Sequence, residues 1–147
     1  MRHGALLHDV GKLAIPNEIL HKPGPLTDPE WRVMAEHPVI GERILRRTPQ
    51  LGHLAPIVRH EHERWDGGGY PDGLADTAIP VGSRIILACD AYNAMITTRP
   101  YREAMSTEHA TAELRAMAGT QFDPRVVEAL LERLGAVSAA ASGASAS

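Results

Sequence analysis

The sequence predicts an all-α fold of about six helices arranged around one glycine-rich loop. Apolar residues recur at spacings near three and four along most of the chain, which is the helical period. No segment shows the strict alternation of apolar and polar residues that a half-buried strand requires. Three short motifs of the kind that begins helices support this interpretation: Asp28-Pro29-Glu30, Ser106-Thr107-Glu108 and Asp123-Pro124. The chain is therefore expected to form a helical bundle.

Composition limits the function classes that need to be considered. The 147 residues fit one domain that can bury a core. A net charge of −3 gives no reason to expect a nucleic-acid polymer or a membrane surface as partner. The sequence has no apolar run of transmembrane length and no convincing secretion signal. Cys89 is the only cysteine, which suits a reducing compartment, so we expect a cytoplasmic location.

The two ends of the chain differ in character. The predicted domain covers residues 1–135, whereas residues 136–147 are almost entirely Ala, Ser and Gly. Such a segment has little to bury, so we expect a disordered tail. Ala5-Leu6-Leu7 suggests the inner face of a helix, with almost nothing before it. We therefore expect the sequence to begin within a domain whose first helices are missing.

The opening helix should end near Gly11, because glycine is a common helix terminator. Residues 21–26 hold two prolines and a glycine and should form a loop. The next helix should begin with Asp28 as its cap and run to about Arg47.

Pro38 lies inside the helical pattern of 28–47. Proline lacks a backbone donor, so we expect a kink or break just after His37. The following helix has its apolar face on 51–58 and should carry residues 60–63 at its end.

The second half begins with a loop at 66–73, where four glycines and a proline exclude a regular element. Pro80 should start a helix that is apolar on nearly all sides and therefore buried, with Asp90 inside it. Two further helices should begin at Ser106 and at Asp123.

Residues of the types that bind metal ions lie at or near the ends of several predicted helices. They are His8, Asp9, His37, Glu61, His62 and Asp90. Ordinary alternatives exist, since His37 could simply end a helix and residues 60–63 could form a solvated charged face. Asp90 points more firmly to a site, because burying a carboxylate is costly unless it is paired or bound to a metal. Mixed nitrogen and oxygen ligands favour Fe, Mn or Zn, and two such ions can activate a water and clamp a phosphoryl group.

Three cations are candidates for phosphate contacts. Arg99 and Arg102 flank the rigid Pro100-Tyr101 turn, and Lys12 follows His8-Asp9. The alternative for the two arginines is a surface salt-bridge pair.

These motifs, in this order, resemble the HD-GYP family, a branch of the HD-domain metal-dependent phosphohydrolases. The resemblance covers about residues 5–134, and its most specific part is the glycine-rich Tyr-Pro loop with its leading His-Glu. The matching segments are His8-Asp9-Val10-Gly11-Lys12, Leu20-His21-Lys22-Pro23-Gly24-Pro25-Leu26-Thr27, His37-Pro38-Val39-Ile40-Gly41, residues 62–73, Ile79-Pro80, Arg84-Ile85, Asp90, Arg99-Pro100-Tyr101-Arg102 and Gln121-Phe122-Asp123-Pro124.

The resemblance implies an HD-domain-like helical fold and a metal-dependent phosphodiesterase that hydrolyses cyclic di-GMP to pGpG or GMP. It implies two divalent metal ions, or three in an intact relative, most often Fe or Mn. The implied metal ligands are His8, Asp9, His37, His62 and Asp90.

The resemblance also implies the residues that meet the substrate. Asp9 and Lys12 are the expected catalytic residues. Contacts to the nucleotide are expected from Lys12, Arg99, Arg102 and Tyr70. The Gly67–Pro71 loop would shape the mouth of the site and could contact an upstream sensor domain or a diguanylate-cyclase-type partner.

Two departures from the family pattern keep other functions open. Glu61-His62 stands where the family usually has His-His, and the opening helices, which supply a further His ligand, are missing. Glu61 is a competent ligand, and His60 is a weaker candidate because on a helix it would point about 100° away. There are two alternatives. One is a degenerate module that binds nucleotide or protein, and the other is an HD phosphohydrolase that acts on another phosphate ester. The cations Lys12, Arg99 and Arg102 favour the enzyme, although we expect this chain alone to bind metal weakly and to show little activity.

Overall fold

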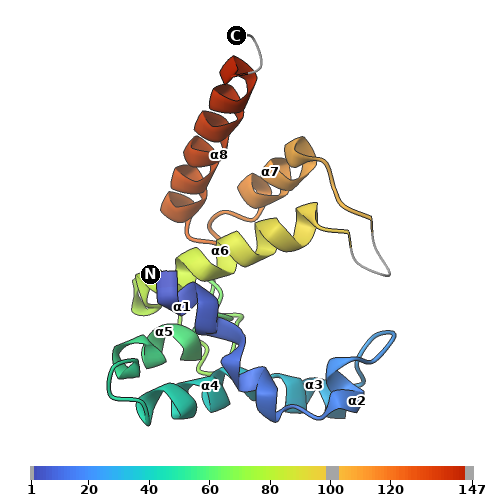
Figure 1. Ribbon diagram of the computed structural model, residues 1–147, viewed down its shortest axis with the longest axis vertical. Helices are drawn as coiled ribbons and strands as arrows, with labels where there is room; N and C mark the ends of the chain where they lie inside the picture. Colours follow the sequence, from blue (N-terminus) through green and yellow to red (C-terminus); the bar gives the residue numbers. More distant parts are fainter. Residues whose placement is uncertain (1, 99–102, 145–147) are drawn as a thin grey trace. The chain divides into compact units, whose positions relative to one another are not determined.

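The computed structural model describes residues 2–98 and 103–144, and this part of the chain is helical (Figure 1). It contains eight α-helices and three short 3-10 helices and no strand, which confirms the all-α prediction. Two more α-helices occur than the six or so expected. A short helix occurs after Pro16, and the predicted helix over 28–47 is divided in two.

The chain divides into two compact units, Met1–Leu87 and Ala88–Ser147, and the boundary falls within α6. The elements of the first unit, in chain order, are α1 (Arg2–Leu7), η1 (His8–Ala14), α2 (Asn17–Leu20), α3 (Asp28–Met34), α4 (His37–Arg46), η2 (Gly52–Leu54), α5 (Ala55–Arg59), η3 (Asp76–Ala78) and the first part of α6 (Val81–Ile96). The second unit holds the remainder of α6, α7 (Thr107–Ala116) and α8 (Pro124–Ala144).

Gly11 does not end the opening helix. The helix tightens at His8 into η1, which continues past Gly11 to Ala14. A Cβ atom on Gly11 would lie 1.9 Å from the carbonyl oxygen of His37 and 2.7 Å from the amide nitrogen of Gly41. Glycine is therefore needed here because η1 crosses α4 with backbone against backbone. This crossing brings the His8-Asp9 segment to the start of α4.

The helix break near Pro38 falls before His37 rather than after it. α3 ends at Met34, and α4 begins at His37 with Pro38 in its first turn. The first turn of a helix has no intrahelical use for its N–H groups, so proline is accommodated there without a kink. The cap of α3 is Thr27 and not Asp28, and it forms a capping box with Glu30.

The helix that was expected to carry residues 60–63 stops earlier. α5 ends at Arg59, and residues 60–62 form a turn. The apolar core of this unit consists of residues from α4, η2 and α5, with partly buried residues of α1 and η1 packed against it. Its fully buried members are Leu45, Leu54, Ala55 and Val58. Ser83 at the start of α6 donates a hydrogen bond to the carbonyl oxygen of Ile57 at 2.7 Å, which ties α6 to α5.

The glycine-rich segment 66–73 is a loop, as expected. It folds back on the residues that precede it, since a Cβ on Gly69 would lie 2.4 Å from the amide nitrogen of Arg64 and 2.5 Å from Cα of Glu63. The Tyr70–Pro71 peptide bond is cis. The loop therefore lies directly against the turn that carries Glu61 and His62.

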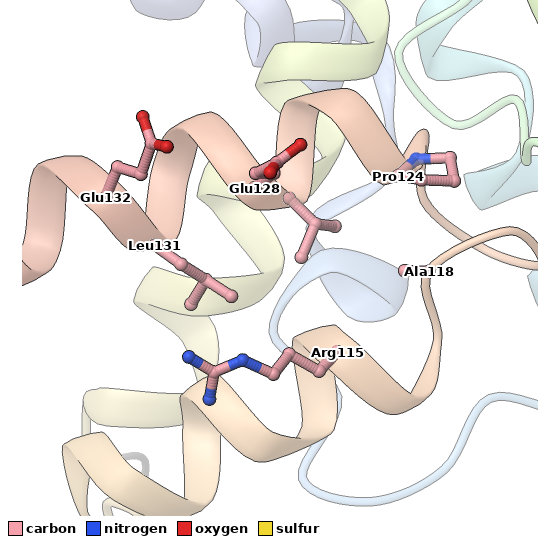
Figure 2. Close-up of a pocket in the computed structure, with 7 residues that line it drawn as sticks. Arg115, Ala118, Pro124, Glu128, Leu131 and Glu132 are labelled. Atoms are coloured by element: carbon pink, nitrogen blue, oxygen red, sulfur yellow. The ribbon is translucent and has the colours of Figure 1, made fainter.

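The second unit follows its predicted helix starts. Ser106 caps α7 by accepting a hydrogen bond from the backbone N–H of His109 at 3.2 Å. Asp123 precedes α8 and accepts from the N–H of Arg125 at 2.9 Å. Figure 2 shows the groove between α7 and α8, which is lined by Arg115, Ala118, Pro124, Val127, Glu128, Leu131 and Glu132.

Two expectations about helices differ from the structure. α8 continues to Ala144, so residues 136–144 of the expected tail are helical; alanine has the highest helix propensity and lets a helix extend. α6 is not buried on all sides, since Val81, Cys89 and Asp90 are exposed. None of the helices in 2–98 and 103–144 combines the length and apolar character needed to cross a membrane.

Candidate metal centre

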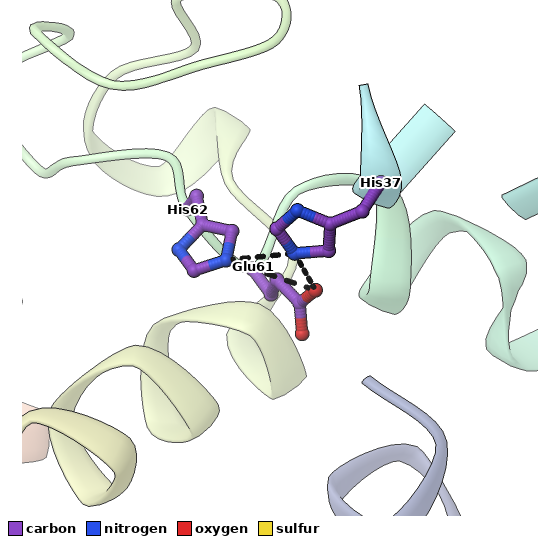
Figure 3. A group of neighbouring side chains, drawn as sticks. All are labelled: His37, Glu61 and His62. Atoms are coloured by element: carbon purple, nitrogen blue, oxygen red, sulfur yellow. Dashed lines mark hydrogen bonds and ion pairs between the residues drawn. The ribbon is translucent and has the colours of Figure 1, made fainter. Parts of the chain in front are cut away.

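Three side chains of the first unit converge on one point: His37, Glu61 and His62 (Figure 3). Nε2 of His37 lies 3.1 Å from Nε2 of His62 and 3.5 Å from Oε1 of Glu61. Nε2 of His62 lies 4.0 Å from the same Glu61 oxygen. His37 and Glu61 are almost fully buried, with exposed fractions of 2% and 1%. We call this group the triad.

The donor spacing of the triad fits a single divalent ion. Ligands at about 2.1 Å from an ion are about 3.0 Å apart at adjacent octahedral positions and about 3.4 Å apart in a tetrahedron. The three separations lie close to this range, and all the donor atoms lie within 4.8 Å of one another. Two imidazoles and one carboxylate form a set that suits Fe, Mn or Zn.

His37 is oriented by its place at the start of α4. Its Nδ1 donates a hydrogen bond to the carbonyl oxygen of Met34, the last residue of α3, at 2.8 Å. This bond fixes the ring and the tautomer. The unprotonated Nε2 then directs its lone pair toward the other members of the triad, as is usual for histidines that bind metals. His62 comes from the turn after α5 and is held by Tyr70 of the glycine-rich loop, whose ring stacks on it at 4.9 Å between centroids.

Both triad histidines are neutral near pH 7. Burial lowers the pKa of His37. Burial, together with the repulsion that a protonated His37 and Lys12 would exert, lowers the pKa of His62 to about 4. A neutral imidazole offers a lone pair to a metal without first losing a proton.

The His8-Asp9 pair lies beside the triad. Oδ1 of Asp9 is 3.7 Å from Nε2 of His37, and Oδ2 of Asp9 is 3.5 Å from Nε2 of His8. Asp9 thus lies between two imidazoles, and its two oxygens face different nitrogens. A carboxylate in this position is able to serve a second ion next to the first.

Lys12 forms an ion pair with Asp9 in this structure. Its Nζ lies 2.7 Å from Oδ1 of Asp9, one turn away along η1. Burial acts to raise the pKa of Asp9, but the hydrogen bond and charge of Lys12 outweigh it, and the pKa is lowered. Asp9 is therefore ionised and ready to bind a cation.

The structure favours Glu61 over His60 as the third member of the triad. His60 is engaged elsewhere: its Nε2 lies 2.9 Å from Oδ2 of Asp72, and its Nδ1 lies 2.8 Å from the carbonyl oxygen of Pro56. The expectation based on a helical position for His60 does not apply, because α5 has already ended at Arg59.

The remaining predicted site residues are Asp90, Arg99, Arg102 and Tyr70, and none of them belongs to the triad. Asp90 belongs to the second unit and is exposed, so the burial that singled it out is absent. Arg99 and Arg102 lie outside the described residues. Tyr70 is partly buried, and burial raises the pKa of its phenol.

A charged network that the sequence did not reveal fixes the glycine-rich loop. Arg59 donates to both carboxylate oxygens of Asp72 at 2.7 Å and also to Glu42 of α4 at 2.6 Å. The backbone N–H of Asp72 donates to the buried carboxylate of Glu63 at 2.7 Å. The only sequence signal was a set of charges scattered over 30 residues, whose pairing depends on the fold.

Asp72→Asn should loosen this loop and lower stability by about 1 kcal/mol, after a reduction for the partial exposure of the pair. Arg59 and His60 lower the pKa of Asp72 to about 2, so the folded state binds fewer protons than the unfolded state between pH 3.8 and about 2. The contribution is therefore present above pH 3.8 and is lost as the pH falls toward 2.

Thermal melting of wild type and Asp72→Asn from pH 2 to 6 measures this effect. The difference in melting temperature should shrink as the pH falls. Asp76→Asn is the matched control, because Asp76 is exposed and its φ of 57° is tolerated by Asn. A pH-independent difference would contradict the assignment.

Comparison with known proteins gives one family for most of the chain. Residues 1–126 match the family described as HD domain. The cyclic di-GMP phosphodiesterase response regulator RpfG of Xanthomonas campestris pv. campestris is 49% identical over 131 residues, which cover 86% of this chain and 34% of that protein. A cyclic di-GMP phosphodiesterase of Thermotoga maritima is 43% identical over 134 residues, or 90% of this chain and 36% of the relative. The chain thus spans about a third of the length of these relatives.

A solved structure agrees in fold. The crystal structure of a cyclic GMP-AMP specific phosphodiesterase from Vibrio cholerae (V-cGAP3) superposes with a TM-score of 0.67 at 20% identity, over 90% of this chain and 38% of that one. This confirms the HD-domain-like helical fold.

Proposed function

Because this chain belongs to the HD-domain family, we propose that it is the phosphodiesterase domain of a protein that hydrolyses cyclic di-GMP to pGpG or GMP in bacterial second-messenger signalling. The relatives that are 49% and 43% identical carry the name cyclic di-GMP phosphodiesterase. The resemblance of the motifs to the HD-GYP branch points to the same reaction. The observation that carries the proposal is the triad with Asp9 beside it, since metal-dependent phosphoryl transfer needs such donors.

His37, Glu61 and His62 would hold one ion, and Asp9 with His8 would contribute to a second, with Fe or Mn as the proposed metals. When bound, such ions polarise the phosphoryl oxygens, activate the attacking water and neutralise developing charge. Asp90 remains a proposed further ligand.

The chain's own residues then have distinct tasks. Asp9 holds its charge at neutral pH and orients the groups on either side of it. Lys12 places an ammonium next to the Asp9 carboxylate, where it can stabilise the added negative charge of the transition state. Arg99 and Arg102 are proposed to bind the phosphates, and Tyr70 borders the triad through its stack on His62.

Two alternatives use the same site differently. A module that binds nucleotide or a protein partner without turnover is favoured by Glu61, which adds a negative charge where the family pattern has a second His. An HD phosphohydrolase for another phosphate ester would use the same triad, and a mixed cyclic GMP-AMP dinucleotide is the obvious substrate to compare. The proposal also includes a partner at the Gly67–Pro71 loop, either an upstream sensor domain or a diguanylate-cyclase-type protein. It further includes a cytoplasmic location.

The test is an anaerobic reconstitution of the complete gene product that carries this chain, with Fe(II) or Mn(II), followed by chromatography of the products. We expect metal-dependent conversion of cyclic di-GMP to pGpG or GMP. His37→Ala should abolish it, whereas Glu36→Gln, an exposed neighbour, should not. Tight nucleotide binding without product under either metal would replace the enzyme by the binding module, and turnover of cyclic GMP-AMP alone would change the substrate.

A further inference from the structure

Trp31 has an unusual position for a large aromatic residue. It lies on α3, a helix that buries none of its seven residues, and half of its own surface is exposed. Trp31 lies at a helical spacing from Met34 in the sequence, yet in the structure it is not part of the core. An exposed indole retains a large apolar face that a planar ligand can cover.

Trp31 is the outer end of a row of rings that begins at the triad. Its ring meets Tyr70 edge to face, with 5.8 Å between centroids and 77° between planes. Tyr70 stacks on His62 at 4.9 Å and 13°, and His62 is in contact with His37. The exposed indole is therefore only two ring contacts away from the donors that would hold the metal.

The helix that carries Trp31 is anchored at both ends, although Trp31 itself is exposed. The helix start is fixed by Thr27, whose N–H donates to Glu30 at 2.7 Å, and Lys22 also pairs with Glu30. The helix end is fixed by the bond from His37 to the carbonyl oxygen of Met34. A platform held at both ends loses little conformational entropy when it binds a ligand.

We propose that Trp31 stacks on a guanine base of the cyclic dinucleotide whose phosphate lies at the triad. This inference rests on the proposed function and adds a base-binding position to it. Stacking on an aromatic ring needs no hydrogen bonds to the base. Each base stacked on an aromatic side chain typically raises affinity by about five- to hundredfold. The phosphate contacts and the base contact then fix the ligand at two points.

Fluorescence of Trp31 is the direct test. In the complete gene product, Trp65→Phe removes the other tryptophan of this chain, and Trp31→Phe in the same background gives the emission to subtract. Titration with cyclic di-GMP at constant metal concentration should quench its emission, whereas ribose 5-phosphate, which has phosphate and sugar but no base, should leave it unchanged. Unchanged emission at saturating cyclic di-GMP, with saturation followed by calorimetry, would overturn the proposal.

Affinity measurements separate stacking from a structural effect. Trp31→Ala should raise the dissociation constant about tenfold, and Trp31→Phe should stay within about threefold of wild type. Val33→Ala, also exposed on α3, should match wild type in affinity and melting temperature. Equal affinity of Trp31→Ala and wild type would refute the platform.

Hydrolysis distinguishes the two proposals. Turnover by wild type with a KM that does not respond to Trp31→Ala would leave the proposed function standing and refute the platform. Trp31-dependent binding without turnover would support the platform and refute catalysis.

Discussion

Gly11→Ala should cost about 3 kcal/mol or more and lower the melting temperature by about 10 °C. The new methyl group would lie 1.9 Å from the carbonyl oxygen of His37 and 2.7 Å from the amide of Gly41. Both are backbone atoms, so no side-chain rotation relieves the clash, and η1 must move away from α4. Because Asp9 lies on η1 and His37 starts α4, the same movement should weaken metal binding.

A graded series of glycine variants makes this prediction specific. A Cβ on Gly41 would meet a side-chain methyl of Val58 at 2.9 Å, so Gly41→Ala should cost less than Gly11→Ala. A Cβ on Gly135 in α8 meets nothing within 4 Å, and Gly135→Ala should be neutral or stabilise by up to about 1 kcal/mol. Melting curves and metal content should follow this order; equal melting temperatures for the Gly11 and Gly135 variants would refute the close crossing.

Glu61→Gln should lower metal affinity by about tenfold or more, since even changes to residues that only orient a ligand cost about ten- to hundredfold. Gln keeps the size of Glu but removes the charge from a side chain that is 1% exposed and lies 3.5 Å from Nε2 of His37. Glu61→His, which restores the pair of histidines typical of the HD-GYP pattern, should raise metal occupancy.

Chelator competition and metal analysis of the complete gene product measure both changes. Glu36→Gln is the matched control, since it removes the same charge from an exposed residue next to His37. Unchanged affinity in Glu61→Gln together with unchanged occupancy in Glu61→His would mean that Glu61 is not a ligand. Trp31→Ala should leave metal affinity and metal content unchanged, because Trp31 is not among the proposed ligands. The tests of Trp31 are therefore independent of the tests of Glu61.

The sequence by itself determined the helical class and most helix starts, and it singled out His37, Glu61 and His62 as candidate ligands. Such features depend on local chemistry: Ser106 caps α7 because its hydroxyl reaches an N–H three residues on, and Pro80 precedes α6 because proline suits a helix start. The glycines of 66–73 likewise exclude a helix wherever they occur.

Only the tertiary structure decided which residues meet. Gly11 looked like a terminator in sequence, yet its role depends on the distant backbone of α4. His37 begins a helix instead of preceding a kink, and this places its Nε2 against Glu61 and His62, 24 and 25 residues further along the chain. The exposure of Trp31 and Asp90 was equally hidden, because helical periodicity predicts one face of a helix but not whether another element covers it.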